Sequence, residues 1–159
     1  MENLFAPWRM EYIEKGKKEG CIFCDVFKEN DDKKNLILTR STHSFLIMNR
    51  YPYNNGHLMV VCNLHKKDIE EFNKEEILDI FSLLSKAIEV LKKVLSPQGF
   101  NIGINLGEVA GAGVKDHFHI HIVPRWQGDT NFMPLLCETK VISEHLRTTY
   151  EKLLPYFQK

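Results

Sequence analysis

The sequence predicts an α+β fold in which a mainly antiparallel sheet of about five strands packs against one long helix. Two observations lead to this: several short segments alternate apolar and polar residues, and residues 74–94 carry apolar side chains at helical spacing. Alternation is typical of a half-buried strand, whereas recurrence every three or four residues is typical of an amphipathic helix. The length of 159 residues suits a single domain over 1–159, with an N-terminal arm over 1–20 and a C-terminal helical extension over 135–159.

Before the long helix, the pattern predicts three strands, the last two joined as a hairpin. Residues 36–39 and 44–49 are apolar enough to form strands, and a charged loop over 28–34 precedes them. Residues 51–56 combine Pro, Asn and Gly, which are residues that turns favour. Residues 57–62 follow as an apolar run, so we expect them to pair with the preceding strand in antiparallel fashion.

After the long helix, residues 100–106 alternate again and predict a fourth strand. Three glycines fall in the loop over 107–116, where small residues let the backbone approach a ligand and offer its N–H groups to a phosphate. A fifth strand follows over 117–123, and Pro124 is expected to end it. The last predicted element is a helix over 143–157, capped by the serine at its start.

The composition is that of a soluble globular protein, with 43% hydrophobic and 26% charged residues. Lysine and arginine together number 21, as do aspartate and glutamate, so the formal net charge is zero. This balance argues against binding to nucleic acid or to a membrane surface, and any anion site must be local. No apolar run approaches the roughly 20 residues of a transmembrane helix. The N-terminal residues lack the basic-then-apolar order of a signal peptide, which predicts a cytoplasmic location.

The most informative segment is the predicted fifth strand. Side chains two residues apart share one face of a strand, so His117, His119 and His121 would lie in a row on a face open to solvent. Three imidazoles suggest phosphate, metal or proton chemistry near neutral pH. The pattern leaves three interpretations: zinc ligation in a hydrolase, attack of a neutral imidazole on phosphorus, and surface histidines without function. The preceding glycine loop favours attack on phosphorus, because its N–H groups could stabilise phosphoryl oxygens.

A second motif, Cys21-Ile22-Phe23-Cys24, lies near the N-terminus. In an intracellular protein a CxxC can be half of a zinc site, a redox motif or an idle pair of thiols. A redox motif would be expected in a βαβ context, which the pattern lacks, whereas the histidines could complete a zinc site, which is therefore favoured. Cys62 and Cys137 lie in apolar surroundings and are expected to be buried, inert thiols.

Residues 117–123 resemble the signature of the histidine triad (HIT) family, in which three histidines alternate with apolar residues. The resemblance covers most of the chain: it includes the CxxC, the hairpin over 49–60 and residues 110–134. Residues 123–133 and residues 6–13 are most similar to the branch of microbial diadenosine polyphosphate phosphorylases and fragile-histidine-triad proteins. The resemblance therefore implies a HIT-like α+β fold and a homodimer.

The resemblance also implies roles for the three histidines. His119, the middle one, would be the nucleophile that attacks the α-phosphorus and forms a nucleotidyl-histidine intermediate. His121 would hydrogen-bond a phosphate oxygen, and His117 would orient His119 through its backbone. Members with a CxxC resemble galactose-1-phosphate uridylyltransferase, which implies one structural zinc ion per chain. Its four ligands here would be Cys21, Cys24, His65 and His117.

A nucleotide site follows from the same resemblance. Asn49 stands where the family has Asp or Asn on the ribose hydroxyls, and Asn105 would hold a phosphate oxygen. The base would lie against the apolar side chains of Ile22, Phe23, Val26 and Ile47. The phosphates would lie against backbone N–H groups of Gly111, Ala112, Gly113 and Val114. Compared with members that have Asp, Asn49 removes a charge from the ribose site, and the chain lacks the Gly-Gln-Ser/Thr pattern that many members have before the triad. Backbone N–H groups or Lys115 would then assist the leaving group.

The activity that the resemblance implies is cleavage of dinucleoside polyphosphates, such as diadenosine tetraphosphate. Phosphate as the acceptor would make the protein a phosphorylase, and water would make it a hydrolase. Three alternatives stay open: hydrolysis of purine nucleoside phosphoramidates, a nucleotide-binding sensor, and a zinc-dependent metalloenzyme that uses the triad as ligands.

Overall fold

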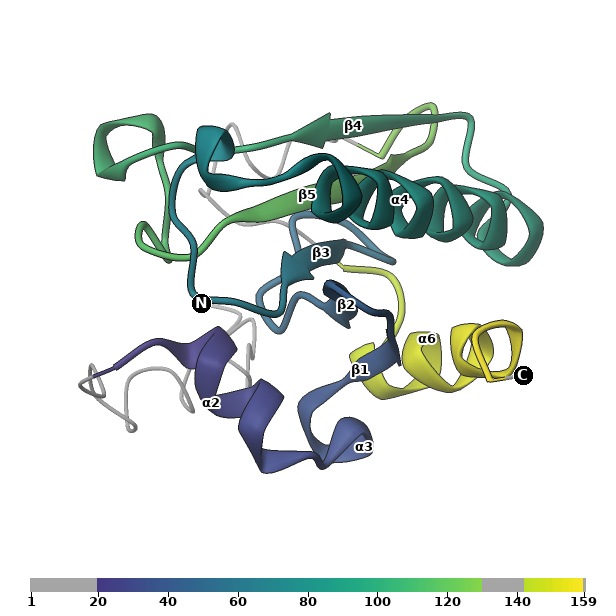
Figure 1. Ribbon diagram of the computed structural model, residues 1–159. Coiled ribbons are helices and arrows are strands. Elements are labelled where there is room, and N and C mark those ends of the chain that lie inside the picture. Colours follow the sequence, from purple (N-terminus) through teal and green to yellow (C-terminus); the bar gives the residue numbers. More distant parts are fainter. Residues whose placement is uncertain (1–19, 130–141, 159) are drawn as a thin grey trace, which may run out of the picture.

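The computed structural model describes residues 20–129 and 142–158, with five strands in one sheet in the order β1-β2-β3-β5-β4 (Figure 1). Every neighbouring pair of strands is antiparallel, which confirms the predicted fold class. The strands are β1 (Ile37–Arg40), β2 (Ser44–Met48), β3 (Leu58–Cys62), β4 (Gly99–Gly103) and β5 (His119–Arg125). The helices are α2 (Ile22–Glu29), α3 (Asp32–Asn35), α4 (Lys74–Leu95) and α6 (Leu146–Leu153), with 3₁₀ turns η1 (Ile69–Glu71), η2 (Glu108–Ala110) and η3 (Leu154–Tyr156).

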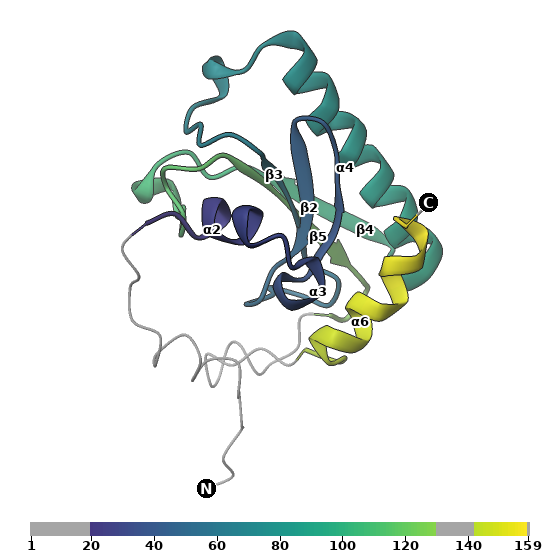
Figure 2. The ribbon, with the colours of Figure 1, turned by 60° about the horizontal axis from the view of Figure 1, so that its bottom comes forward.

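Helices cover both faces of the sheet, with α4 and α6 on one side and α2 on the other (Figures 1 and 2). Because successive side chains of a strand point to opposite faces, β2 divides its residues between two cores. Leu46 and Met48 pack into the core beneath α4, whereas Phe45 and Ile47 pack with Phe23 of α2. The histidines of β5 lie on the α2 side, since Ile120 and Ile122 belong to the core beneath α4.

The long helix is well defined at its start. Asn73 accepts a hydrogen bond from the Glu76 amide, and the Glu76 carboxylate accepts one from the Asn73 amide, each at 2.9 Å. Such a reciprocal cap satisfies two amides that would otherwise lack partners at the helix end. α4 therefore begins at Lys74, as the sequence predicts, and ends one residue later than expected.

Several elements differ from the prediction. Residues 28–34 are not a loop: α2 runs to Glu29 and α3 begins at Asp32, because the Asp31 side chain caps the short helix through the amide of Lys34. The last helix is capped by His145 and not by the predicted serine. Cys137 and most of the proposed arm lie outside the described residues, so the boundaries at 20 and 135 stay predictions.

Pro124 does not end the last strand but lies inside it, opposite Phe100 of β4. In a strand the N–H and C=O of one residue point to the same side, and the Pro124 carbonyl accepts a hydrogen bond from the Asn54 side chain. On that side the pairing with β3 has already stopped at Ile122. In the part of the chain that the structure describes, no strand pairs with residue 124 on that side, so the missing N–H of proline is tolerated.

Within the described residues, none of the helices has the length and apolar composition needed to cross a bilayer.

The turn between β2 and β3 depends on a glycine. Gly56 has φ of +71°, and a Cβ there would lie 2.5 Å from Cδ1 of Leu95 and 3.3 Å from Cδ2 of Leu91. β3 begins two residues after this glycine, at Leu58. A side chain at position 56 would strain the backbone and push the turn away from the helix.

We expect Gly56→Ala to lower the free energy of unfolding by about 1–3 kcal/mol, because it adds both left-handed strain and overpacking. Gly99→Ala is the matched control, since a Cβ there meets no atom within 4 Å. Its effect should stay within about 0.5 kcal/mol. Urea denaturation measures both, and equal losses in the two variants would contradict this account.

Candidate functional site

The triad histidines are less open to solvent than the sequence suggests. His117 is 1% exposed and His119 is 5% exposed, so the predicted solvent-open row is wrong for these two. The cause is α2, whose Phe23 ring lies 5.4 Å from the His117 ring and 5.0 Å from the His119 ring, between centroids. His121 is partly exposed, opposite Gly103 on the edge strand β4. The absent side chain at Gly103 leaves this flank of His121 uncovered.

Backbone carbonyls decide which nitrogens of His117 and His119 carry a proton. The Nδ1 of His119 lies 2.9 Å from the His117 carbonyl oxygen, and the Nε2 of His117 lies 2.8 Å from the Cys62 carbonyl oxygen. A carbonyl oxygen can only accept, so both of these ring nitrogens donate. When the rings are neutral, Nε2 of His119 and Nδ1 of His117 keep their lone pairs, the first for a nucleophile and the second for a metal.

Burial keeps the three imidazoles neutral near pH 7. It lowers the pKa of His117 and His119 below the usual 6.5, against hydrogen bonds to backbone carbonyls that act in the opposite direction. For His121, burial and then the nearby His119 lower the pKa to about 4. A neutral His119 presents a lone pair at physiological pH, which a nucleophile requires.

The four residues that the family resemblance implies as zinc ligands do converge. Their ligand atoms, one each from Cys21, Cys24, His65 and His117, all lie within 4.8 Å of one another. The Cys21 Sγ lies 3.2 Å from Nδ1 of His117, and the Cys24 Sγ lies 3.3 Å from Nδ1 of His65. A tetrahedral zinc ion separates its sulfur and nitrogen ligands by about 3.5 Å, given the usual bond lengths. The donor set and its spacing therefore fit such an ion.

Two elements and one anchored loop bring these ligands together. The cysteines lie at the start of α2, and His117 lies two residues before the first residue of β5. The loop that carries His65 is held by the Lys66 carbonyl, which accepts from the Phe118 amide at 2.7 Å. The Lys66 ammonium also pairs with Glu76 at the start of α4. His65 thus occupies a fixed place beside β5.

Only one member of the triad belongs to this cluster. Within residues 20–129 and 142–158, the candidate metal ligands include His117 but neither His119 nor His121. The arrangement therefore gives no support to a metalloenzyme that uses all three histidines as ligands. It separates a metal cluster from the two histidines that stay available for other chemistry.

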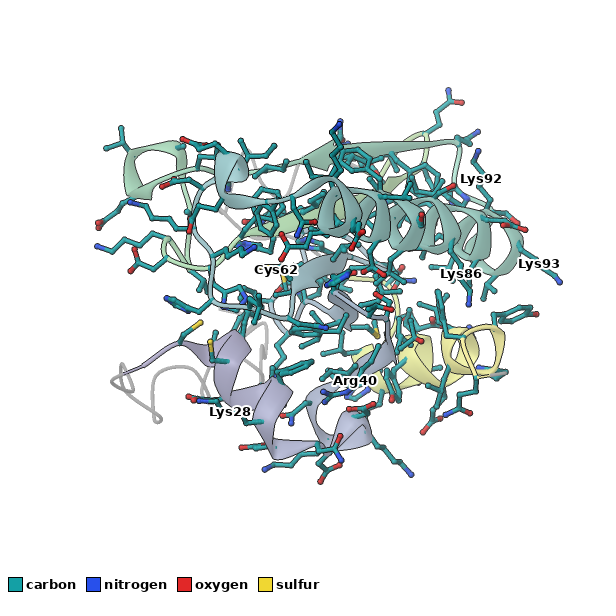
Figure 3. All side chains as sticks on the ribbon, viewed as in Figure 1. Lys28, Arg40, Cys62, Lys86, Lys92 and Lys93 are labelled. Atoms are coloured by element: carbon teal, nitrogen blue, oxygen red, sulfur yellow. The ribbon has the colours of Figure 1, made fainter. Side chains whose placement is uncertain are left out.

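Cys62 is a buried thiol, as predicted, and is 2% exposed on β3 in the centre of the molecule (Figure 3). Burial raises the pKa of this thiol to about 11. It is therefore unreactive near neutral pH.

Three of the four residues expected to line the base site lie together, and the fourth does not. Phe23, Val26 and Ile47 pack together with Val114 in the apolar cluster on the α2 side of the sheet. Ile22 is 54% exposed and does not join that cluster. An apolar wall beside His119 thus exists without a contribution from Ile22.

The two asparagines of this predicted site support backbone turns. The Asn49 side-chain oxygen accepts from the Tyr51 amide at 2.8 Å, and the Asn105 side chain donates to the Gly111 carbonyl at 3.2 Å. Gly111 itself has φ of +88°, which favours glycine. Gly107 has φ of +86° and its carbonyl accepts from the Ala112 amide, so the glycine loop closes on itself. These contacts hold the loop in a defined shape just before the triad.

Sequence reasoning missed one residue of the site, His57. This histidine is fully buried, and its Nε2 lies 2.9 Å from Nδ1 of His121. The Tyr53 ring lies against both, with centroids 4.7 Å from His57 and 5.8 Å from His121. The available signal was a histidine at the start of an otherwise apolar strand, directly after a glycine.

Comparisons with known proteins match residues 30–128 to the HIT domain. An AP-4-A phosphorylase of Mycobacterium tuberculosis (strain ATCC 25618 / H37Rv) is 36% identical over 157 residues, which cover 94% of this chain and 80% of that protein. An asymmetrical bis(5'-nucleosyl)-tetraphosphatase of Schizosaccharomyces pombe is 32% identical over 93 residues, which cover 58% of this chain and 50% of that protein. The crystal structure of a Zn-bound histidine triad family protein from Mycobacterium smegmatis superposes with a TM-score of 0.69 at 21% identity, covering 87% of this chain and 93% of that one, and so shows the same fold.

We expect the purified protein to bind one tetrahedral metal ion per chain, since four protein ligands close the coordination shell. Replacing a ligand in Cys24→Ser should weaken binding by at least about 100-fold, because even changes around the ligands cost 10–100-fold. Elemental analysis and the visible spectrum of the cobalt-loaded protein measure this. Cys62→Ser is the matched control and should keep the full metal content. Tight tetrahedral binding that survives Cys24→Ser would disprove the assignment.

Proposed function

Since the chain belongs to the histidine triad family, we propose that it is an enzyme that cleaves dinucleoside polyphosphates, such as diadenosine tetraphosphate, at the α-phosphate. The relative named AP-4-A phosphorylase, which aligns with 94% of the chain, supports this substrate class. The observation that carries the proposal is the state of His119. Its Nδ1 donates to a carbonyl and burial lowers its pKa, so a neutral ring offers the Nε2 lone pair.

In the proposed reaction, Nε2 of His119 attacks the α-phosphorus while the bond from phosphorus to the bridging oxygen breaks. The leaving nucleotide takes that electron pair, and the first nucleotide stays bound to His119 through a phosphorus–nitrogen bond. An oxygen atom of the acceptor then attacks phosphorus from the side that the leaving nucleotide has vacated. The electron pair of the phosphorus–nitrogen bond returns to Nε2, and the acceptor proton passes to solvent. His121 donates a hydrogen bond to a phosphate oxygen in both steps.

Phosphate is the acceptor that we favour. The AP-4-A phosphorylase covers nearly the whole chain, whereas the relative named asymmetrical tetraphosphatase covers 58% of it. With phosphate as acceptor, diadenosine tetraphosphate yields ATP from the first step and ADP from the second. With water the second product would be AMP.

The nucleotide would lie on the α2 side of the sheet. Phe23 is the central wall of the base site, because its ring touches the rings of both His117 and His119. Val26 and Ile47 extend this apolar wall, which provides stacking energy but little discrimination between bases. The glycine loop over 111–114 and Asn105 would meet the phosphates, and Asn49 the ribose.

We also propose that the metal is zinc and that its role is structural. Two thiolates and two imidazoles form a set that zinc prefers, and no position stays open for a substrate. The ion would tie the start of α2 to His117 and so hold Phe23 against His119. Cysteine ligands stay reduced in the cytoplasm, which is the location that we propose.

A homodimer is the proposed assembly. Among the described residues, the outer edge of β4 has no partner strand, and Ile102 on it is 46% exposed. Leu78 and Phe81 on α4 are also exposed, at 69% and 53%. An open strand edge and exposed apolar side chains are features suited to pairing with a second copy.

Sedimentation equilibrium should give twice the chain mass at micromolar concentration. Ile102→Lys should shift the protein toward the monomer, because a charge would be buried in the interface. Tyr156→Gln changes an exposed aromatic residue on η3 and should leave the dimer intact. A monomeric wild-type protein, or equal dissociation of both variants, would refute the assembly.

Product analysis tests the function. We expect diadenosine tetraphosphate to give ATP and ADP only when phosphate is present, with AMP bound to His119 in quenched samples analysed by mass spectrometry. His119→Ala should lower turnover by at least about 10³-fold, since no other group replaces the nucleophile. His43→Ala removes a histidine away from the site and should keep full activity. Undiminished turnover in His119→Ala would overturn the mechanism, and no cleavage of any dinucleoside polyphosphate would overturn the substrate class.

A further inference from the structure

Lys115 lies in the loop between β4 and β5, directly before the triad. Among residues 94–124, all of which the structure describes, it is the only lysine or arginine. Figures 1 and 2 show this loop beyond the ends of the two strands, at the same end of the molecule as the start of α2. On this part of the chain, a lysine or arginine charge beside the triad can therefore come only from Lys115.

The backbone that carries Lys115 is held on both sides. Before it, the Val114 side chain packs in the apolar cluster of Phe23, which is the proposed base site. After it, the Phe118 amide donates to a backbone carbonyl of the loop that follows β3, at 2.7 Å. Four residues of extended chain span at most about 14 Å, so the Cα atom of Lys115 lies no farther than that from the Cα atom of His119. The long Lys115 side chain can then reach phosphates beyond the one that His119 attacks.

In the structure, the Lys115 charge is taken up by a carboxylate of the same loop. The Lys115 ammonium donates to the Glu108 carboxylate across 3.1 Å, and Glu108 begins η2 at the other end of the loop. The two side chains are 54% and 77% exposed. An ion pair this open to water contributes little to stability, so it can be exchanged for a stronger pair at small cost. A polyphosphate group is a stronger partner, because it carries several charges and many acceptor oxygens.

We propose that Lys115 exchanges Glu108 for the phosphates of the leaving nucleotide, and so selects substrates by the number of phosphates beyond the α-phosphate. The identity of the substrate rests on the proposed function, whereas the preference of this loop for a polyphosphate does not. Glu108 is the competitor in the exchange, since it pairs with Lys115 until a more highly charged ligand displaces it. A ligand with the α-phosphate alone gains nothing, because that group lies at His119 and His121.

The same contact would assist cleavage. When the bond from the α-phosphorus to the bridging oxygen breaks, the electron pair passes to the leaving nucleotide, whose phosphate chain gains negative charge. A cation held beside that chain stabilises the charge as it develops. The exchange itself forms no covalent bond and moves no proton.

A purely structural role for the ion pair makes a different prediction for Glu108. If the pair only held the loop in shape, removing either charge would loosen the loop and weaken binding alike. In the proposed exchange the two changes have opposite signs. Lys115→Met removes the cation and weakens polyphosphate binding, whereas Glu108→Gln removes the competitor and strengthens it.

Two further variants serve as controls. Lys115→Arg keeps the positive charge and should keep the selectivity. Lys34→Met breaks another exposed ion pair of the same length, 3.1 Å to Glu29, on the short helix α3. α3 precedes β1, and β2 and β3 lie between β1 and β5 in the sheet. Lys34→Met therefore reports the effect of losing a surface ion pair away from the loop.

The first readout is calorimetric binding of AMP and of ATP to the metal-loaded, full-length protein in phosphate-free buffer. We expect ATP to bind wild type at least about tenfold more tightly than AMP, and Lys115→Met to remove most of this advantage while AMP affinity stays within about twofold. Unchanged AMP affinity also shows that the variant is folded. Lys115→Arg and Lys34→Met should keep the ratio of the two affinities within about threefold. Glu108→Gln should raise ATP affinity by about two- to fivefold.

Two results would overturn the proposal: an unchanged ratio of ATP to AMP affinity in Lys115→Met, or a loss of ATP affinity in Glu108→Gln equal to that in Lys115→Met. The second readout, cleavage of diadenosine tetraphosphate, separates the exchange from the proposed function. We expect kcat/KM to fall by about tenfold in Lys115→Met. An unchanged kcat/KM would refute the exchange and leave the proposed function standing. If wild type cleaves no dinucleoside polyphosphate, the proposed function fails, and the ATP and AMP affinities still decide the exchange.

Discussion

The site depends on His117, whose three polar groups each have a separate task. Its Nε2 donates to the Cys62 carbonyl, its Nδ1 faces the two cysteine sulfurs, and its own carbonyl accepts from His119. A change at any of these contacts would be transmitted to the other two, because one rigid residue makes all three. The metal cluster and the proposed nucleophile are therefore parts of one structure, although the metal takes no part in the proposed chemistry.

Because successive side chains of β5 point to opposite faces, its core residues and its histidines lie on different sides of the sheet. Ile120 and Ile122 enter the core beneath α4 and contribute to stability, while the intervening histidines face α2. α2 then completes the candidate site, because a motif of four residues supplies two candidate metal ligands and also the ring of Phe23. The histidines of β5 and the cysteines of α2 thus lie on elements that are held in place by apolar packing.

Sequence alone predicted the parts of this protein whose signal lies within one segment. The apolar spacing over 74–94 predicts α4 to within one residue, and the alternation over 117–123 predicts a strand that is observed two residues later, at His119–Arg125. His57 was missed because its partner, His121, lies 64 residues away, and an isolated histidine before an apolar run gives no sign of that contact. The cover that α2 places on the triad was missed for the same reason, and Pro124 was misjudged because its neighbours across the sheet were unknown.

The backbone partners of these histidines would suit a site that accepts a polyphosphate, as the proposed function requires. A carboxylate would orient an imidazole just as well, but its negative charge would repel an incoming anion at close range. His117 and His119 each donate to a backbone carbonyl, and His57 accepts from a backbone amide. These groups carry no net charge and do not titrate. These three backbone contacts therefore orient the rings without a carboxylate beside them, which would suit the polyphosphate substrate of the proposed function.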